Sequence, residues 1–212
     1  KVVFTSSDKA VNPTSTMGAS KLLGERLVIA ANNIVGNSGT RFATVRFGNV
    51  LNSSGSVIEI FREQIVKGLP LSITSLKMTR FFLTIPNAVD LCLYAAENMV
   101  GGEIFVQNMR VFRLKELAEA LCPIKSKFDY VLVGSRPGEK IFEELLSEHE
   151  KNRAYELDNA IVILPDMVKY LPTNAIKKID HISRFPKMDK PLRSDEFEPI
   201  PVEEMRDILA EL

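Results

Sequence analysis

An aspartate and a lysine stand side by side directly after the first apolar run of the sequence. Val2-Val3-Phe4 is typical of a buried strand, and Ser6-Ser7-Asp8-Lys9 follows it. In an open α/β sheet, ligands bind beyond the carboxyl ends of the strands. A carboxyl group and an amine at such a place can donate and accept a proton, as an acid and base pair does. The alternative is that Asp8 and Asn12 only shape a turn, with the lysine solvated.

Several other polar residues follow predicted strands or precede predicted helices. Lys21, four residues after Met17, adds a second ammonium group to the same crevice. Ser56 precedes a helix whose amino end could accept a phosphate, although an ordinary serine cap is the commoner case. Arg80 and Arg136 could each bind an anion through two N–H groups, or form surface salt bridges.

The composition excludes several classes of protein. Of 212 residues, 45% are hydrophobic and 25% are charged, which is typical of a soluble globular protein. Lys and Arg total 27, as do Asp and Glu, so there is no net charge to attract nucleic acid. The longest apolar runs are shorter than the ~20 residues that span a bilayer, so we expect no membrane segment in this chain. The two cysteines and two histidines are too few for a disulfide framework or a Cys/His metal site, which favours a reducing, cytoplasmic setting.

The elements that must position these residues alternate between strand and helix patterns, which favours an α/β domain with a largely parallel sheet. We expect strands at 1–6, 40–47, 71–73, 80–85, 103–107, 130–133 and 161–164. We expect helices after a cap at Ser15 or Thr16, at 57–67, 86–99, 114–121 and 202–212, and from the 135–140 loop through Leu146. In the first helix, the residues expected to face the sheet are Leu23, Leu27, Ala30, Ala31 and Ile34.

Together these motifs resemble one enzyme family. Asp8-Lys9-Ala10-Val11-Asn12-Pro13, followed by Met17-Gly18-Ala19-Ser20-Lys21, resembles the catalytic stretch of the UDP-N-acetylglucosamine 4,6-dehydratases, in the extended short-chain dehydrogenase/reductase superfamily. The resemblance covers about residues 1–146. Its further segments, in family order, are Arg46-Phe47-Gly48-Asn49-Val50, Gly55-Ser56-Val57, Met78-Thr79-Arg80-Phe81, Gly102-Glu103-Ile104-Phe105-Val106 and Arg136-Pro137-Gly138-Glu139-Lys140.

The resemblance implies NAD, rather than NADP, as the cofactor and conversion of UDP-N-acetylglucosamine to a 4-keto-6-deoxy sugar in polysaccharide or glycan biosynthesis. It implies that Lys9 removes the C5 proton, that Asp8 donates a proton to the departing C6 hydroxyl and that Ser7 orients the C4 oxygen. Lys21 would contact the nicotinamide ribose. Further implied cofactor contacts are Phe47 and Gly48, and implied substrate contacts are Asn49, Ser56, Val57, Arg80, Arg136 and Glu139.

The resemblance also implies the organisation of the protein. Residues 1–165 would be the C-terminal part of a Rossmann-like NAD-binding domain, interleaved with a smaller substrate-binding subdomain, and 166–212 an extension with a terminal helix. We expect a homo-oligomer. Inversion at C5 is favoured over retention because the segments around Arg80 and Arg136 look closer to the short, inverting members.

The sequence departs from the superfamily pattern in two ways. Met17 stands where the superfamily has the tyrosine of Tyr-x-x-x-Lys, and a thioether has no proton to exchange. Some dehydratases carry methionine there, so we expect Met17 to mark a subgroup. The glycine fingerprint that binds a dinucleotide pyrophosphate is absent from the 212 residues. We therefore expect roughly a hundred preceding residues, or three βαβ units of roughly 30 residues each.

Two other classes of function remain open. A nucleotide-sugar epimerase would share the fold and NAD but would not need the Asp8 and Lys9 pair. A non-catalytic domain that binds a nucleotide-sugar or a partner chain would fit Met17 and the absent glycine fingerprint.

Overall fold

The computed structural model describes residues 1–34, 39–53, 55–123, 128–158, 160–166 and 173–211. The chain divides into two compact units, which we describe separately. The first comprises Lys1–Gly48, Pro86–Asn108 and Glu144–Arg193, and the second comprises Asn49–Ile85, Met109–Glu143 and Ser194–Leu212. The predicted domain boundary after residue 165 stays a prediction.

A five-stranded sheet forms the centre of the first unit, in the order β1-β2-β6-β11-β10. Three strands are parallel: β1 (Val2–Ser7), β2 (Phe42–Phe47) and β6 (Ile104–Val106). The fourth strand, β11 (Ile161–Ile163), is antiparallel both to β6 and to the last strand, β10 (Ala154–Glu156). The predicted α/β class with a mainly parallel sheet is confirmed.

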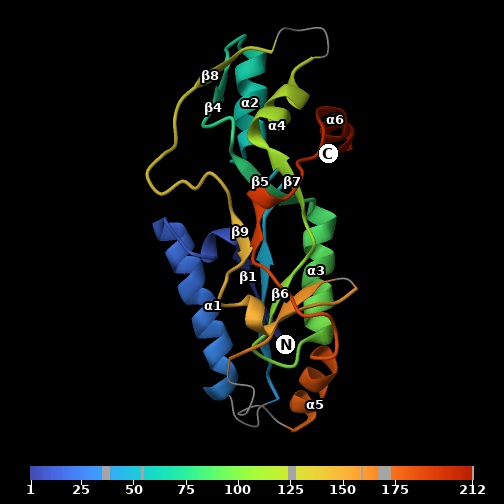
Figure 1. The fold of residues 1–212 in the computed structure, drawn as a ribbon. Helices are drawn as coiled ribbons and strands as arrows, with labels where there is room; N and C mark the ends of the chain where they lie inside the picture. The colour runs from blue at the N-terminus through green and yellow to red at the C-terminus, as the bar shows by residue number, and fades with distance from the viewer. Residues whose placement is uncertain (35–38, 54, 124–127, 159, 167–172, 212) are drawn as a thin grey trace. The chain divides into compact units, whose positions relative to one another are not determined.

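Helices cover both faces of this sheet (Figure 1). On one face, α3 (Ile85–Asn98) packs its buried Leu91 and Ala95 into a cluster with Ala43 and Val45 of β2. Two residues of α5 (Thr173–Ile182) join the same cluster. The other face meets α1 (Thr16–Ile34), whose Glu25 bonds to Arg46 of β2. Successive side chains of a strand point to opposite faces, so one face of the sheet is apolar and the other is partly polar.

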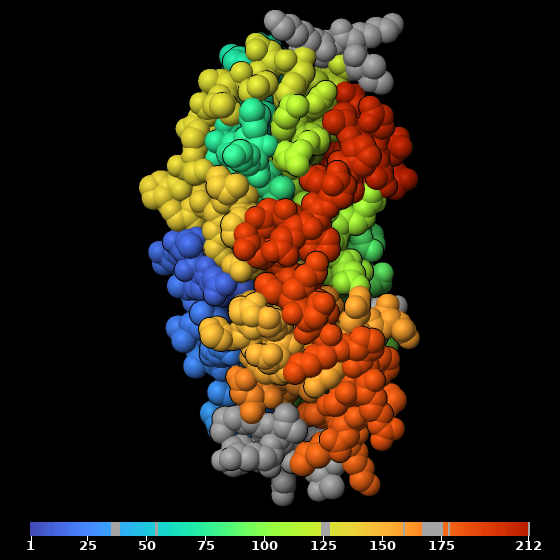
Figure 2. Space-filling model, in the orientation of Figure 1, coloured from blue at the N-terminus to red at the C-terminus, as the bar shows by residue number. Residues whose placement is uncertain are grey.

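The orientation of α1 contradicts the sequence prediction. Leu23, Leu27 and Ile34, expected to face the sheet, are 60%, 63% and 82% exposed. The fully buried residues of α1 are Gly18 and Glu25. The prediction was wrong because β2 carries a buried arginine on this face, and a buried cation requires an anionic partner. Ala30 is likewise exposed and Ala31 half-buried, and Figure 2 shows part of α1, in blue, at the surface.

The second unit packs three helices around short strands. Its helices are α2 (Val57–Val66), α4 (Leu114–Leu121) and α6 (Val202–Ala210). One sheet has the order β3-β5-β7, with β3 at Asn49–Val50, β5 at Thr79–Leu83 and β7 at Arg110–Arg113, and another pairs β4 (Leu71–Ile73) with β8 (Tyr130–Leu132). The core of this unit includes Ile58, Phe61, Phe112, Leu117 and Met205.

The segment that ends at Leu146 also differs from its prediction. It was expected to be an amphipathic helix, but Glu144–Leu146 forms strand β9, which pairs with β12 (Leu192–Arg193). The partner lies more than forty residues away along the chain, where local periodicity carries no information about it. The sequence patterns also did not indicate β3, β7, β10, β12 and α5, or the short 3-10 turns η1 (Asp8–Ala10), η2 (Lys151–Arg153) and η4 (Ser194–Glu196).

The other predicted helices and strands are present, with ends shifted by at most two residues in the described chain. Within the described ranges, each helix is too short or too polar to cross a membrane.

Candidate functional site

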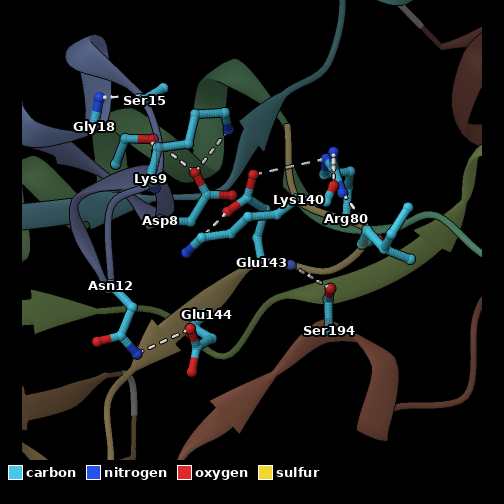
Figure 3. Close-up of polar contacts among 12 residues, drawn as sticks. Asp8, Lys9, Asn12, Ser15, Gly18, Arg80, Lys140, Glu143, Glu144 and Ser194 are labelled. Atoms are coloured by element: carbon cyan, nitrogen blue, oxygen red, sulfur yellow. Dashed lines mark hydrogen bonds and ion pairs between the residues drawn. The ribbon is translucent and has the colours of Figure 1, made fainter. Parts of the chain in front are cut away.

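Asp8 and Lys9 form a close pair at the end of β1 (Figure 3). The Lys9 ammonium donates to Asp8 Oδ1 at 2.8 Å, and the Ser7 hydroxyl donates to the same oxygen at 2.7 Å. The Asp8 side chain is fully buried, whereas that of Lys9 is 29% exposed. Asp8 Oδ2 is buried and has no hydrogen-bond partner among the described residues. One carboxylate oxygen therefore remains available for a ligand.

A short 3-10 turn holds this pair. Ser7 is the N-cap of η1 in extended conformation, and the N–H of Val11 donates to the Asp8 carbonyl at 3.0 Å. Asn12 then takes a positive φ of 45°, which asparagine tolerates better than most residues. Its side-chain amide donates to Glu144 Oε2 at 3.0 Å. The turn is thus fixed both locally and by a residue of β9.

The start of α1 lies directly against the backbone of Lys9. A Cβ atom on Gly18 would lie 2.3 Å from the Lys9 carbonyl oxygen, so only glycine allows this approach. The N–H of Gly18 donates to Ser15 Oγ at 3.2 Å, which makes Ser15, one of the two predicted caps, the residue that closes the helix end. The position of Lys9 therefore depends on the first turn of α1.

Lys21 reaches the end of β1 from the second turn of α1. Its ammonium donates to the Thr5 carbonyl at 3.1 Å and lies 5.4 Å from the centroid of the Phe4 ring. Met17 lies in the first turn of the helix and is 49% exposed.

Of the predicted cofactor contacts, Phe47 is the last residue of β2 and Gly48 follows it. Both lie at the same edge of the sheet as Ser7, since Ser7 pairs with Phe47. The first unit thus brings six of the predicted site residues to one edge of its sheet: Ser7, Asp8, Lys9, Lys21, Phe47 and Gly48.

Met17 also belongs to the first unit, and the other predicted site residues belong to the second unit. Arg80 is buried and donates to the carbonyls of Thr79 at 2.8 Å, Ile141 at 3.2 Å and Lys140 at 2.8 Å. Its Nε lies 4.0 Å from Glu143 Oε1. Arg80 therefore organises residues 140–143, and its contact with a substrate stays a prediction.

Two predicted substrate contacts carry buried polar atoms without a hydrogen-bond partner among the described residues. They are Asn49 Oδ1, in β3, and Ser56 Oγ, at the N-cap of α2. The Ser56 side chain does not cap its own helix, of which Val57 is the first residue. Buried polar atoms are normally paired, so these two oxygens are suited to a ligand.

Arg136 and Glu139 lie in an exposed loop. The Glu139 carboxylate accepts a hydrogen bond from the backbone N–H of Arg136 at 3.0 Å, and the N–H of Glu139 donates back to the Arg136 carbonyl at 3.0 Å. Glu139 thus fixes the backbone of Arg136, and the contact of either residue with a substrate stays a prediction.

Sequence reasoning missed two residues beside Arg80. Glu143 lies 3.8 Å from the Lys140 ammonium, and its N–H donates to Ser194 Oγ at 3.0 Å. Ser194 is fully buried and shares a 2.8 Å hydrogen bond with Thr79 Oγ1. A lone serine in a polar segment offers no sequence signal for such a contact. Among the described residues, no cluster of three or more His, Cys, Asp or Glu side chains could hold a metal ion.

The model of one protein family, described as "Polysaccharide biosynthesis protein", matches residues 1–165. An uncharacterized membrane protein of Methanocaldococcus jannaschii is 45% identical over 173 residues, or 78% of this chain and 52% of that protein. A UDP-N-acetylglucosamine 4,6-dehydratase (inverting) of Campylobacter jejuni is 38% identical over 186 residues, or 87% of this chain and 52% of that protein. A UDP-glucose 4-epimerase of Rickettsia rickettsii is 43% identical over 158 residues, or 74% and 46% of the two chains. The chain thus spans about half the length of these curated relatives.

Solved structures share the fold. Pen from Bacillus thuringiensis is 33% identical with a TM-score of 0.86, and the match covers 99% of this chain and 61% of that one. DesIV, a dTDP-glucose 4,6-dehydratase from Streptomyces venezuelae solved with NAD and TYD, is 17% identical with a TM-score of 0.56. That match covers 66% of this chain and 49% of the other.

Proposed function

Because this chain belongs to the polysaccharide biosynthesis protein family, we propose that the complete protein is a nucleotide-sugar 4,6-dehydratase. The substrate would be UDP-N-acetylglucosamine, and the product a UDP-4-keto-6-deoxy sugar, with C5 inverted. The buried Asp8 carboxylate paired with Lys9 carries the proposal, because an elimination needs one group to take a proton and another to donate one. A relative named as an inverting dehydratase supports the choice of reaction.

The pair can reach the required protonation states by itself. Moving one proton along the 2.8 Å hydrogen bond from Lys9 to Asp8 gives a neutral amine and a carboxylic acid. The amine would then remove the C5 proton, and the acid would protonate the C6 hydroxyl as it leaves as water. These two transfers return Lys9 to its ammonium form and Asp8 to its carboxylate form, so the elimination balances. Over the whole turnover, the proton that the C4 hydroxyl would release on oxidation balances the one that C5 would gain when hydride returns to C6. A bound sugar would exclude water from the exposed side of Lys9 and favour the neutral pair.

NAD is the proposed cofactor, as in the NAD-bound structure of DesIV. When bound, it would accept hydride from C4 and later supply hydride to C6. Lys21 suits the nicotinamide ribose, because its ammonium lies toward the carboxyl end of β1, where it donates to the Thr5 carbonyl at 3.1 Å. Ser7 would orient the C4 oxygen, and Phe47 and Gly48 would line the same edge.

The second unit would bind the nucleotide-sugar. Asn49 Oδ1 and Ser56 Oγ offer buried acceptors, and Val57 would contact the sugar beside them. The exposed Arg136 guanidinium is suited to a diphosphate, while Glu139 fixes its backbone. Arg80 would contribute positive charge and hold residues 140–143 in place. We also expect the complete protein to be a homo-oligomer, which sedimentation at micromolar concentration would test.

A nucleotide-sugar 4-epimerase is the second candidate, because a relative of that name is 43% identical. An epimerase needs hydride transfer at C4 but no acid and base pair for C5 and C6. The fully buried Asp8 beside Lys9 therefore favours the dehydratase.

The complete protein, supplied with UDP-N-acetylglucosamine in deuterated water, distinguishes these functions. The dehydratase should yield a UDP-4-keto-6-deoxy sugar with one deuterium at C5, seen by NMR and by the mass lost as water. A product of unchanged mass with the C4 hydroxyl inverted would identify an epimerase. Substrate binding without any turnover would identify a binding domain and refute the proposal.

A further inference from the structure

A buried cluster of three charged side chains joins α1, β2 and the turn after β9. Arg46 Nε and Nη2 donate to the two carboxylate oxygens of Glu25 at 3.0 and 2.7 Å. Arg46 Nη1 and Nη2 donate to the two carboxylate oxygens of Glu150 at 3.1 and 3.0 Å. Arg46 Nη1 also donates to the Leu145 carbonyl at 2.9 Å. All five N–H groups of the guanidinium therefore donate to acceptors inside the protein.

The cluster is well satisfied despite its burial. Arg46 and Glu25 are fully buried, and Glu150 is 5% exposed. Both the N–H and the hydroxyl of Ser147 donate to Glu150 Oε2, at 3.1 and 2.9 Å. Burial disfavours the charge on Arg46, but the two carboxylates outweigh it and raise the pKa of the guanidinium.

Apolar packing alone does not set where α1 lies along the sheet. Its apolar side chains Leu23 and Leu27 point away from the sheet. Three other residues of α1, each seven positions from the next, contact the sheet and the turn after β1. Gly18 packs on the Lys9 carbonyl, Glu25 bonds to Arg46, and Asn32 exchanges hydrogen bonds of 2.9 and 3.0 Å with the backbone of Phe42. A bidentate ion pair is directional, whereas apolar contact is not. The contact of Glu25 with Arg46, the middle one of the three, therefore defines the position of α1 along the sheet.

The Glu25 contact lies next to Lys21. The two residues are four apart on α1 and so share one side of the helix, about 6 Å along its axis. On the sheet, Arg46 is opposite Ser6, the residue after Thr5, whose carbonyl accepts from Lys21. Along α1, the contact of Lys21 with Thr5 is therefore one helical turn from the contact of Glu25 with Arg46. On the sheet, the two contacts lie at neighbouring residue positions.

We propose that Arg46 is a positioning residue: bound to Glu25 and Glu150, it sets the position of α1 along β2 and thereby places the Lys21 ammonium at the end of β1. The inference rests on the proposed function only in taking Lys21 as a cofactor contact. Replacing a buried ion cluster by apolar side chains is often neutral or stabilising, so a fold needs no such cluster for stability alone.

A variant of the complete protein that removes all three charges tests this role. Glu25→Leu, Arg46→Met and Glu150→Leu together should leave the unfolding temperature within about 5 °C of the parent. NAD retained on purification should nevertheless fall at least tenfold, as it should in Lys21→Ala. Adding Lys21→Ala to the triple variant should lower retention no further, because a lysine that is absent cannot be misplaced. Lys67→Ala, which breaks the exposed pair with Glu63, is the control that should change nothing.

Three outcomes would overturn the proposal. The first is a triple variant that retains NAD as the parent does, and the second is a loss of NAD retention that adds fully to the loss in Lys21→Ala. The third is an unchanged rate of hydrogen exchange in residues 16–24. Exchange is measured on cofactor-free protein, where residues 16–24 should exchange at least threefold faster in the variant and α3 should not change. This readout stands even if the parent binds no NAD, which would refute the proposed function alone. If the triple variant does not fold, Arg46→Lys takes its place, both alone and combined with Lys21→Ala, because one ammonium cannot bind both carboxylates bidentately.

Discussion

The Lys9 ammonium donates to Asp8 Oδ1 over 2.8 Å from the next position in the chain, and the two side chains differ sharply in burial. Asp8 is closed off from water, whereas Lys9 is 29% exposed. A ligand that covers Lys9 would remove the remaining water from an ion pair that is already half dehydrated.

Lys9→Ala should abolish water loss while leaving cofactor and substrate binding in place. The loss of a positioned base costs roughly 10²- to 10⁴-fold in rate. The reaction should stop after the first hydride transfer, so absorbance of NADH should persist while the C5 proton no longer exchanges with heavy water. Rapid-scan absorbance and NMR measure the two effects. C5 exchange at the parent rate would show that another group is the base.

Asp8→Asn should separate the two proton transfers. The amide keeps an oxygen that can accept from Ser7 and Lys9, but it cannot supply the acid proton. Lys9, which cannot pass its proton to an amide, would release it to water through its exposed side, so C5 exchange should continue while formation of the 6-deoxy product falls by roughly 10² or more. Parallel measurement of deuterium incorporation and product by NMR checks this. An equal loss of both would assign Asp8 to the C5 step as well.

Met17→Ala and Lys21→Ala should behave differently, although both residues lie in the first two turns of α1. Met17 is half-exposed and has no proton to exchange, so its removal should reduce turnover by less than about tenfold. Lys21→Ala should weaken NAD retention and hydride transfer together, since its ammonium lies at the end of β1. Steady-state rates and cofactor content of the purified proteins give the comparison. A larger loss of turnover in Met17→Ala than in Lys21→Ala would assign the essential role to Met17.

Acid should destabilise the first unit through Glu150. Burial opposes its ionisation, but the charge and hydrogen bonds of Arg46, with those of Ser147, hold its pKa at about 2, below the ordinary 4.5. A carboxylate with a lowered folded pKa stabilises the fold above its unfolded pKa and loses that contribution as pH falls through the folded value. The free energy of unfolding should decrease between pH 4.5 and 2, by on the order of 3 kcal/mol from this group. Glu150→Gln should flatten that part of the profile in denaturant titrations. An unchanged profile would contradict the assignment.

The 212-residue chain alone should not bind NAD stoichiometrically, because its sequence contains no glycine fingerprint for the pyrophosphate. Titration calorimetry of this chain decides the matter. Micromolar affinity would mean that Lys21, Phe47 and Gly48 suffice without that turn.

Features that depend on near neighbours in the chain were predictable from the sequence. Asp8 and Lys9 meet because adjacent residues enter one 3-10 turn, and Ser15 caps α1 because its hydroxyl needs to reach only the third residue after it. Apart from the amphipathic helix expected through Leu146, the predicted strands and helices lie where their patterns indicated. The motifs in the sequence also indicated a family of polysaccharide biosynthesis proteins, and the model of that family matches residues 1–165.

Tertiary structure decided what depends on partners far apart in the sequence. Asn12 bonds to Glu144 across 132 positions, and Arg46 bonds to Glu25 and Glu150 across 21 and 104. Periodicity identified the two sides of α1 but not which one packs, because that depends on what the sheet presents. Once β2 buries an arginine, the cost of leaving its charge unpaired exceeds the gain from burying leucines. The side of α1 that carries Gly18, Glu25 and Asn32 therefore packs inward, and Leu23, Leu27 and Ile34 remain exposed.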